Sequence, residues 1–180
     1  MTAFDNNRRK ILLGIGAAAA LSQVPLTAHA SLSAPKRLSF YNRHTGESTS
    51  QTFWTPSQYD PSALDAFNRV LRDHRTGETM PMDNGLYELL HDLTRVLDTD
   101  RRIEIISGYR SPKTNAMLAG KSAKVAKKSY HMKGMAIDIA IPGVELSDLR
   151  KAALSLKRGG VGYYPKSGFV HVDTGRVRQW

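Results

Sequence analysis

Hydrophobic patterns of two different periods follow one another along this chain. Apolar residues recur at helical spacing over residues 64–71 and again over residues 86–97. Because these helical patterns precede most of the β-prone runs, the order favours an α+β fold over alternating β-α units. We expect a single domain in which helices pack on a small, mainly antiparallel sheet. The later β-prone runs lie at residues 102–107, 134–141, 161–164 and 169–173.

Turn and capping residues predict where several elements begin. Residues 38–44 and 49–54 are two β-prone runs, and the turn residues between them predict a hairpin. Residues 120–128 are polar and rich in lysine, which predicts an exposed loop. Helix starts are predicted at four N-cap residues, two of them followed by proline: Asp60, Asp83, Ser111 and Ser147.

The first 30 residues resemble an export signal rather than part of a fold. A charged opening at residues 6–10 precedes an apolar stretch at residues 11–24 and a small-x-small end at Ala28-His29-Ala30. The paired Arg8-Arg9 resembles a twin-arginine signal; an ordinary secretory signal or an uncleaved anchor are the alternatives. Cleavage after Ala30 would leave a domain of 150 residues, 31–180. No later apolar run reaches membrane-spanning length, so we expect a soluble, monomeric protein of the periplasm or cell envelope.

Charge and cysteine content limit the partners and the chemistry. The net charge is +10, and it falls to +8 when the predicted signal is removed. A basic surface attracts polyanions, and the export signal favours the cell-wall polymer or anionic lipid over nucleic acid. A basic surface that serves only solubility is the alternative. The chain has no cysteine, so any metal must be bound by His, Asp or Glu.

Three residues stand out as possible metal ligands. Asp138 lies in an otherwise apolar strand, where a carboxylate is costly unless it is paired or metal-bound. His171 is also flanked by apolar residues, and Asp173 shares its strand face. Together with His131, these residues could form a catalytic zinc set of two imidazoles and one carboxylate, with water in the fourth position. The alternatives are hydrogen-bonded core histidines and an Asp138–arginine pair.

Two motifs resemble those of a known family. The first resembles the metal-binding signature of the zinc D-alanyl-D-alanine peptidases, which share a fold with the hedgehog signalling domain. It is Ser129-x-His131-x-x-Gly134-x-Ala136-x-Asp138. Ser107-Gly108-Tyr109-Arg110-Ser111 resembles the second signature of that group. The export signal, the domain size and the ending Arg176-x-Arg178-x-Trp180 most resemble its murein endopeptidase K branch.

The resemblance assigns roles to individual residues. It implies that His131, Asp138 and His171 bind one Zn²⁺ per chain, and that Arg110 contacts a carboxylate or carbonyl oxygen of the substrate. Tyr109, Ser111 and Ser129 would lie beside the substrate or support the ligands. Many relatives carry a catalytic acid three residues before the late histidine, where this chain has Gly168. Asp173 is the substitute candidate, either as general base or as the residue that orients His171.

These roles predict a zinc metallopeptidase that acts on peptidoglycan. The resemblance implies hydrolysis of cross-links between D-alanine and meso-diaminopimelate, or between two diaminopimelates. The alternatives are a D,D- or L,D-carboxypeptidase that trims stem peptides, and a non-catalytic peptidoglycan-binding protein, which Gly168 keeps open. Basic residues of the predicted loop would hold the anionic polymer: Lys121, Lys124, Lys127 and Lys128.

Overall fold

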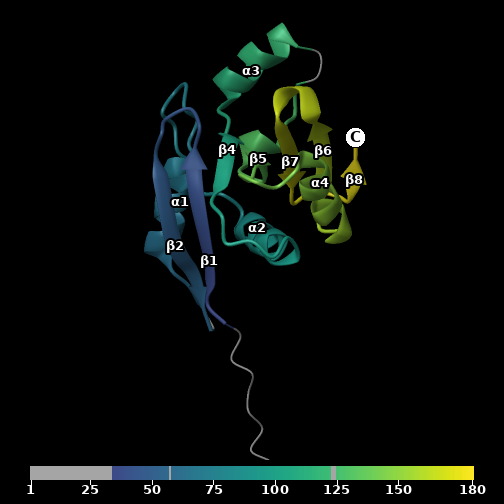
Figure 1. The fold of residues 1–180 in the computed structure, drawn as a ribbon. Coiled ribbons are helices and arrows are strands. Elements are labelled where there is room, and N and C mark those ends of the chain that lie inside the picture. Colours follow the sequence, from purple (N-terminus) through teal and green to yellow (C-terminus); the bar gives the residue numbers. More distant parts are fainter. Residues whose placement is uncertain (1–33, 57, 123–124) are drawn as a thin grey trace, which may run out of the picture. The chain divides into compact units, whose positions relative to one another are not determined.

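The described part of the computed structural model comprises residues 34–56, 58–122 and 125–180, so the predicted export signal and Lys124 lie outside it. Its strands form one sheet in the order β3-β2-β1-β4-β5-β7-β6-β8 (Figure 1). The strands are β1 (Lys36–Asn42), β2 (Ser48–Thr55), β3 (Gln58–Tyr59), β4 (Ile103–Ser107), β5 (Ala136–Ala140), β6 (Gly160–Tyr164), β7 (Phe169–Asp173) and β8 (Arg178–Gln179).

Four α-helices and two short 3₁₀ helices complete the fold of the described residues. The α-helices are α1 (Pro61–Val70), α2 (Asn84–Val96), α3 (Pro112–Lys121) and α4 (Leu146–Ser155). The 3₁₀ helices are η1 (Tyr130–Lys133) and η2 (Pro165–Ser167). The predicted α+β class is confirmed. None of the α-helices in the described ranges has the length and apolar character that a membrane crossing needs.

The sheet is mixed but mostly antiparallel. The predicted hairpin is confirmed as β1 and β2, and β5 pairs antiparallel with both β4 and β7. Two pairs are parallel, β1 with β4 and β6 with β8. A parallel pair needs a crossover connection, and α1 and α2 form the crossover between β1–β2 and β4. The hairpin therefore joins the later strands in one sheet of eight strands, larger than the small sheet predicted.

The predicted helix starts are confirmed at Asp60, Asp83 and Ser111, whose side chains accept hydrogen bonds from the first turn of α1, α2 and α3. The prediction of Ser147 as a cap is wrong. The N-cap of α4 is Glu145, whose carbonyl accepts the first helical hydrogen bonds, so Ser147 already lies inside the helix. The loop prediction for residues 120–128 is wrong at its start, because α3 continues through Lys121.

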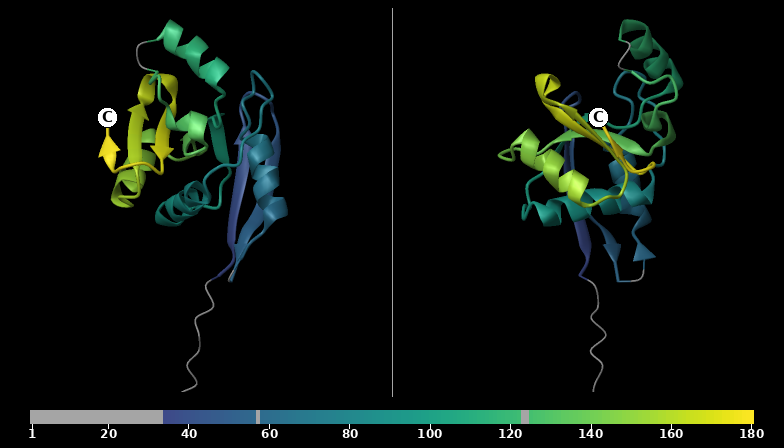
Figure 2. Two further views of the ribbon diagram at one scale, coloured as in Figure 1. Left: turned by 180° about the vertical axis from the view of Figure 1, so that it is seen from behind. Right: turned by 90° about the vertical axis from the view of Figure 1, so that its right-hand side faces the viewer.

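Alternation along the central strands separates the core from the opposite face of the sheet. Ile137 and Ile139 of β5 and Val170 and Val172 of β7 are buried in the hydrophobic core. Each such side chain contributes about 1.5–3 kcal/mol when it leaves water. Helices α1 and α2 pack against the hairpin and α4 against β6 and β7 (Figure 2). The intervening residues of β5 and β7 point to the other face, where the polar side chains lie.

Candidate metal centre

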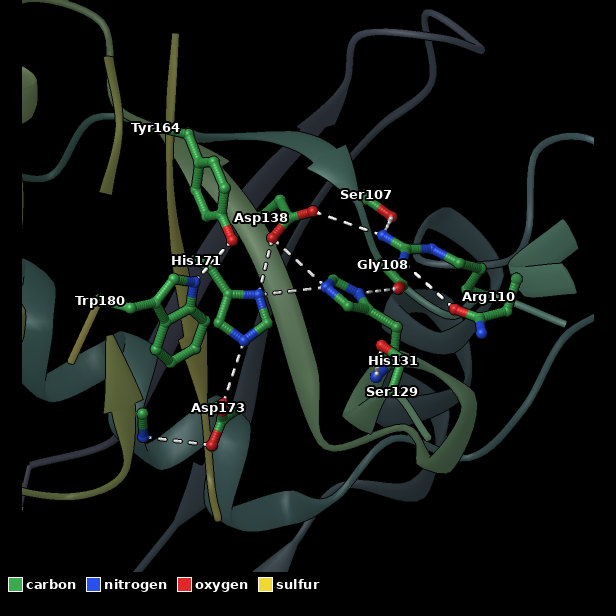
Figure 3. Close-up of polar contacts among 12 residues, drawn as sticks. Ser107, Gly108, Arg110, Ser129, His131, Asp138, Tyr164, His171, Asp173 and Trp180 are labelled. Atoms are coloured by element: carbon green, nitrogen blue, oxygen red, sulfur yellow. Dashed lines mark hydrogen bonds and ion pairs between the residues drawn. The ribbon is translucent and has the colours of Figure 1, made fainter. Parts of the chain in front are cut away.

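Strand pairing aligns the polar residues of the central sheet in one row. Asp138 lies opposite Ser107 of β4 on one side and opposite His171 of β7 on the other. His171 in turn lies opposite Gly162 of β6. His131 comes from η1, immediately before β5, and its side chain reaches the same row (Figure 3). Residues 40 positions apart in the sequence are thereby brought into contact.

The donor atoms of His131, Asp138 and His171 converge. His131 Nε2 lies 3.2 Å from His171 Nδ1 and 3.3 Å from Asp138 Oδ1, and His171 Nδ1 lies 2.8 Å from the same Asp138 oxygen. All three residues are at most 8% exposed. The three residues predicted as ligands thus form one buried group that could hold a metal ion.

The outer nitrogen of each imidazole is held by an acceptor. His131 Nδ1 lies 2.8 Å from the Gly108 carbonyl oxygen, and His171 Nε2 lies 3.0 Å from Asp173 Oδ2. A carbonyl or an ionised carboxylate only accepts, so each outer nitrogen carries the ring proton. In the neutral imidazoles, the inner nitrogens then direct lone pairs toward Asp138 Oδ1. Such convergence of lone pairs is stabilised by a cation at its centre, which is the arrangement of a metal site.

Electrostatics of the buried group favour an ionised carboxylate. Burial alone would raise the pKa of Asp138, but the neighbouring His131 and His171 hold it well below its usual range. Burial lowers the pKa of His131, against the influence of Asp138. Burial also acts to lower the pKa of His171, but its hydrogen bonds to Asp138 and Asp173 raise it overall. The group therefore presents a negative carboxylate and one readily neutral imidazole, as a cation-binding set requires.

A short capped turn presents His131 to the site. Ser129 is the N-cap of η1, and its hydroxyl oxygen lies 3.3 Å from the backbone nitrogen of His131. Gly134 ends η1 with φ +67°, in the left-handed region that favours glycine. A Cβ at Gly134 would also lie 2.8 Å from the carbonyl oxygen of Pro81. The cap at Ser129 and the absence of a side chain at Gly134 therefore both support the backbone path that places the His131 imidazole.

Arg110 lies on the β4 side of Asp138. Its Nη2 is 3.2 Å from Ser107 Oγ and 3.6 Å from Asp138 Oδ2, and its Nη1 is 3.4 Å from the Asn115 side-chain oxygen. The Nε atom is buried and has no hydrogen-bond partner among the described residues. The guanidinium is thus held in place beside the metal-binding group, where its planar fork of donors would suit a carboxylate or carbonyl oxygen of a substrate.

Asp173 lies on the outer side of the His171 ring, away from Asp138. It is fully buried, and besides His171 its carboxylate accepts two hydrogen bonds from Arg178, of 3.0 and 2.6 Å. The backbone nitrogens of Gly175 and Gly160 donate to Oδ1 at 2.8 and 3.1 Å. Burial would raise the pKa of Asp173, but the bonds from His171 and Arg178 lower it. Each carboxylate oxygen of Asp173 therefore already accepts hydrogen bonds from groups of the protein itself.

Comparison with known proteins decides the family. Residues 30–180 match the family described as peptidoglycan L,D-endopeptidase MepK. The chain is 46% identical over 182 residues to the peptidoglycan L,D-endopeptidase MepK of Escherichia coli K12, with 100% of both chains covered. It is 43% identical over 183 residues to the probable peptidoglycan L,D-endopeptidase MepK of Haemophilus influenzae, covering 100% of this chain and 98% of the relative. The chain belongs to the MepK family.

In this MepK family member, Tyr109 and Ser111 support the arginine loop and do not line the cleft at the metal-binding group. The backbone nitrogen of Tyr109 donates to the Leu71 carbonyl at 2.7 Å, and that of Ser111 donates to Asp73 Oδ2 at 2.9 Å. Asp73 is buried and had no sequence signal, because it acts from a loop 38 positions away from Ser111. These bonds fix the backbone on both sides of Arg110.

Gly168 occupies a turn position that suits glycine. It ends η2 with φ +73°, and its backbone nitrogen donates to the Pro165 carbonyl at 3.3 Å. An acidic residue with a Cβ would be strained in this left-handed conformation. The position three residues before His171 therefore contributes to the shape of the turn in this MepK family member.

A cleft of about 490 Å³ opens over the metal-binding group. The cleft is lined by the three predicted ligands together with Arg110, Lys128 and Ser129. Sequence reasoning missed its aromatic wall. The alternation of β6 could have placed Tyr164 on the same face as Gly162, but no periodic signal exists for Trp180, which follows a strand of two residues. The wall consists of Tyr130, Tyr164, Phe169 and Trp180.

Proposed function

We propose that this chain is a zinc-dependent peptidoglycan L,D-endopeptidase of the bacterial envelope. The convergence of His131 Nε2, His171 Nδ1 and Asp138 Oδ1 in a buried group below an open cleft is the observation that supports it most directly. Membership of the MepK family supports peptidoglycan as the substrate, since the family and the relative from Escherichia coli K12 are named peptidoglycan L,D-endopeptidase. The proposal places the protein in the periplasm, where this polymer lies.

Zinc fits the donor set better than a hard cation does. Two imidazoles with one carboxylate and no cysteine form a known catalytic zinc set, whereas Mg²⁺ and Ca²⁺ prefer oxygen ligands. Zinc ligated tetrahedrally at about 2.0–2.1 Å separates neighbouring ligand atoms by about 3.3 Å. The three separations here are 2.8, 3.2 and 3.3 Å, so small movements of the side chains would complete the set. When bound, zinc supplies Lewis-acid chemistry that activates water and polarises a carbonyl.

The residues of the chain itself would bind and orient. Arg110 offers a planar fork of donors, which suits a peptide carbonyl oxygen that gains negative charge during hydrolysis. Asp173 would hold the tautomer and the direction of the His171 ring rather than act as the general base, because its two oxygens already accept from five donors. Ser129 would keep η1 in the conformation that presents His131.

The bond type follows from the stereochemistry in the family name. In a cross-link between two diaminopimelates the acyl group comes from an L centre and the amine from a D centre, so an L,D-endopeptidase cleaves it. A D-alanine–diaminopimelate cross-link joins two D centres. We therefore favour the diaminopimelate–diaminopimelate bond. Lys128, which lines the cleft, would attract the free carboxylates of such peptides.

Digestion of purified, defined muropeptides tests the proposal. The mature protein is incubated with diaminopimelate-linked dimers, with D-alanine-linked dimers and with monomeric tetrapeptides, and the products are separated by chromatography. The proposal expects monomers from the first substrate, loss of this reaction with a chelator, and its return with Zn²⁺. His131→Ala should be inactive, while His91→Ala, on α2 outside the cleft, should match the wild type. Release of terminal D-alanine alone would indicate a carboxypeptidase, and binding without products would indicate a binding protein.

A further inference from the structure

The side chain of Tyr164 lies in the cleft on the side opposite to Arg110. Figure 3 shows its hydroxyl group directed toward the row formed by Asp138 and His171, with the Arg110 guanidinium beyond Asp138 on the other side. Tyr164 has no role in the function proposed above. Like Arg110, it is a polar side chain that lines the cleft beside the metal-binding group.

Gly162, two residues before Tyr164 on β6, leaves room for the Tyr164 ring in the cleft. Gly162 and Tyr164 share one face of β6, because they are two residues apart. A Cβ at Gly162 would lie 2.7 Å from the Trp180 ring and 2.8 Å from the Tyr164 ring. Without a side chain at this position, both rings can lie over β6 beside His171, whose ring centroid is 5.2 Å from that of Trp180.

The ring of Tyr164 is fixed on one side and its hydroxyl on the other. The ring stacks on Phe169 with centroids 4.6 Å apart and planes 22° apart. The Trp180 Nε1–H donates to the Tyr164 hydroxyl oxygen at 2.6 Å. An indole nitrogen only donates, so the hydroxyl is the acceptor in this bond and its own hydrogen stays available. Across residues 34–56, 58–122 and 125–180 that hydrogen has no protein acceptor.

Arg110 and Tyr164 both line the cleft, and Figure 3 shows them on opposite sides of Asp138. Two donors that flank the same point from opposite sides form the usual arrangement for stabilising a tetrahedral oxyanion. One of them, Arg110, brings charge, and the other brings a neutral O–H group whose oxygen is polarised by an indole donor.

We propose that Tyr164 is a catalytic residue of the peptide hydrolysis, whose hydroxyl donates a hydrogen bond to the oxyanion together with Arg110 and is aimed by Trp180. This inference rests on the proposed function. It assigns Trp180 a positioning role, because that residue acts through the phenol oxygen. Since the bond forms only when the carbonyl becomes tetrahedral, Tyr164 should contribute to kcat rather than to substrate binding.

The test compares Tyr164→Phe with Tyr163→Phe on a diaminopimelate-linked dimer. Tyr163 is the matched control, because its ring lies on the other face of β6 against Arg150, with the guanidinium carbon 5.1 Å from the ring centroid. Tyr164→Phe keeps the ring and its stacking and removes only the hydroxyl. We expect kcat to fall about 10²-fold with KM within about twofold, the loss typical of one oxyanion donor. Tyr163→Phe should match the wild type.

A phosphinate analogue of the cross-link provides a second readout. Its tetrahedral anion imitates the oxyanion, so Tyr164→Phe should weaken its binding by the same factor as kcat/KM, whereas binding of the uncleaved peptide to a catalytically inactive background should not change. An unchanged kcat, or a raised KM with kcat intact, would overturn the assignment. Zinc content equal to that of the wild type shows that the metal site is preserved.

Trp180→Phe tests the role of the Tyr164 hydroxyl independently if Tyr164→Phe does not fold. This variant retains the Tyr164 hydroxyl and removes its donor, so we expect kcat to fall about fivefold, the effect of one hydrogen bond. No change in kcat would contradict the positioning role. A wild-type protein that hydrolyses no cross-link would overturn the proposed function itself, which distinguishes that failure from an active enzyme insensitive to Tyr164.

Discussion

Replacement of Asp173 by asparagine should weaken both metal binding and the fold. The carboxylate accepts from His171 Nε2 and thereby keeps the ring proton on the outer nitrogen. An amide that turns its NH₂ group toward His171 would favour the opposite tautomer and place a proton on the inner Nδ1. An amide turned the other way would direct its NH₂ group at Arg178 Nη1 and at the backbone nitrogens of Gly175 and Gly160, which donate to Oδ1 in the wild type. In either orientation the NH₂ group faces donors, two at the Oδ2 position and three at the Oδ1 position, and none of these can accept a hydrogen bond from it without a change of tautomer.

The structure sets the expected magnitude. Loss of a partner that orients a metal-binding histidine typically lowers metal affinity 10- to 100-fold. The two bonds between Asp173 and Arg178 form a buried charge pair, although Arg178 keeps a quarter of its side chain exposed. That exposure puts the loss at the lower end of the range for breaking a buried pair, about 3 kcal/mol. For a domain of this size this corresponds to a decrease in Tm of about 6–12 °C.

The assays are zinc competition against a chromophoric chelator and thermal unfolding of the metal-free protein. Asp148→Asn is the control, because among the described residues the Asp148 carboxylate forms an ion pair with Lys151 alone, on the surface of α4, where the loss should be below about 1 kcal/mol. If Asp173→Asn binds zinc within twofold of the wild type and melts at the same temperature, Asp173 neither orients His171 nor stabilises the fold through Arg178.

Three further substitutions test the loop that carries Arg110. Arg110→Lys keeps the charge but loses the planar fork, so kcat in the muropeptide assay should fall about 10²-fold, while loss of the bonds to Ser107 and Asn115 lowers Tm by only about 2–4 °C. Gly108→Ala places a Cβ 2.4 Å from the Leu71 carbonyl oxygen and should destabilise the fold by about 1–3 kcal/mol in urea unfolding; Gly120→Ala, in open space on α3, should be neutral or gain up to about 1 kcal/mol. Burial would raise the pKa of Asp73, but hydrogen bonds from Thr114 and Ser111 lower it, so its stabilising effect is complete above about pH 4 and is lost as the pH falls further. Asp73→Asn should therefore reduce the difference in unfolding free energy between pH 7 and pH 3, and an unchanged difference would contradict this.

The central site could be predicted because its residues break a local pattern. A carboxylate in an apolar strand and a histidine between apolar residues are unfavourable unless they have a partner, and strand alternation then indicates one shared face. The register that places Asp138 opposite His171 was not predictable, because it depends on which strands become neighbours. For the same reason, the parallel pairing of β1 with β4 was not predictable, because two helices separate these strands in the sequence.

Residues that act through a loop or a single contact gave no sequence signal. The side on which Asp173 meets the imidazole depends on the orientation of the His171 ring and on Arg178, which no spacing rule contains. Asp73 supports the Arg110 loop from a segment without periodicity. Trp180 reaches the cleft through β8, a strand of two residues, too short for alternation to be recognised.

Anomalous X-ray diffraction at the zinc absorption edge tests the central claim most directly. Crystals of the mature protein with stoichiometric Zn²⁺ should show a single strong peak, about 2.0–2.2 Å from His131 Nε2, His171 Nδ1 and Asp138 Oδ1. Crystals of His131→Ala grown in the same way should lose that peak. A wild-type crystal without a peak among these three atoms, or with its zinc bound elsewhere, would contradict the account.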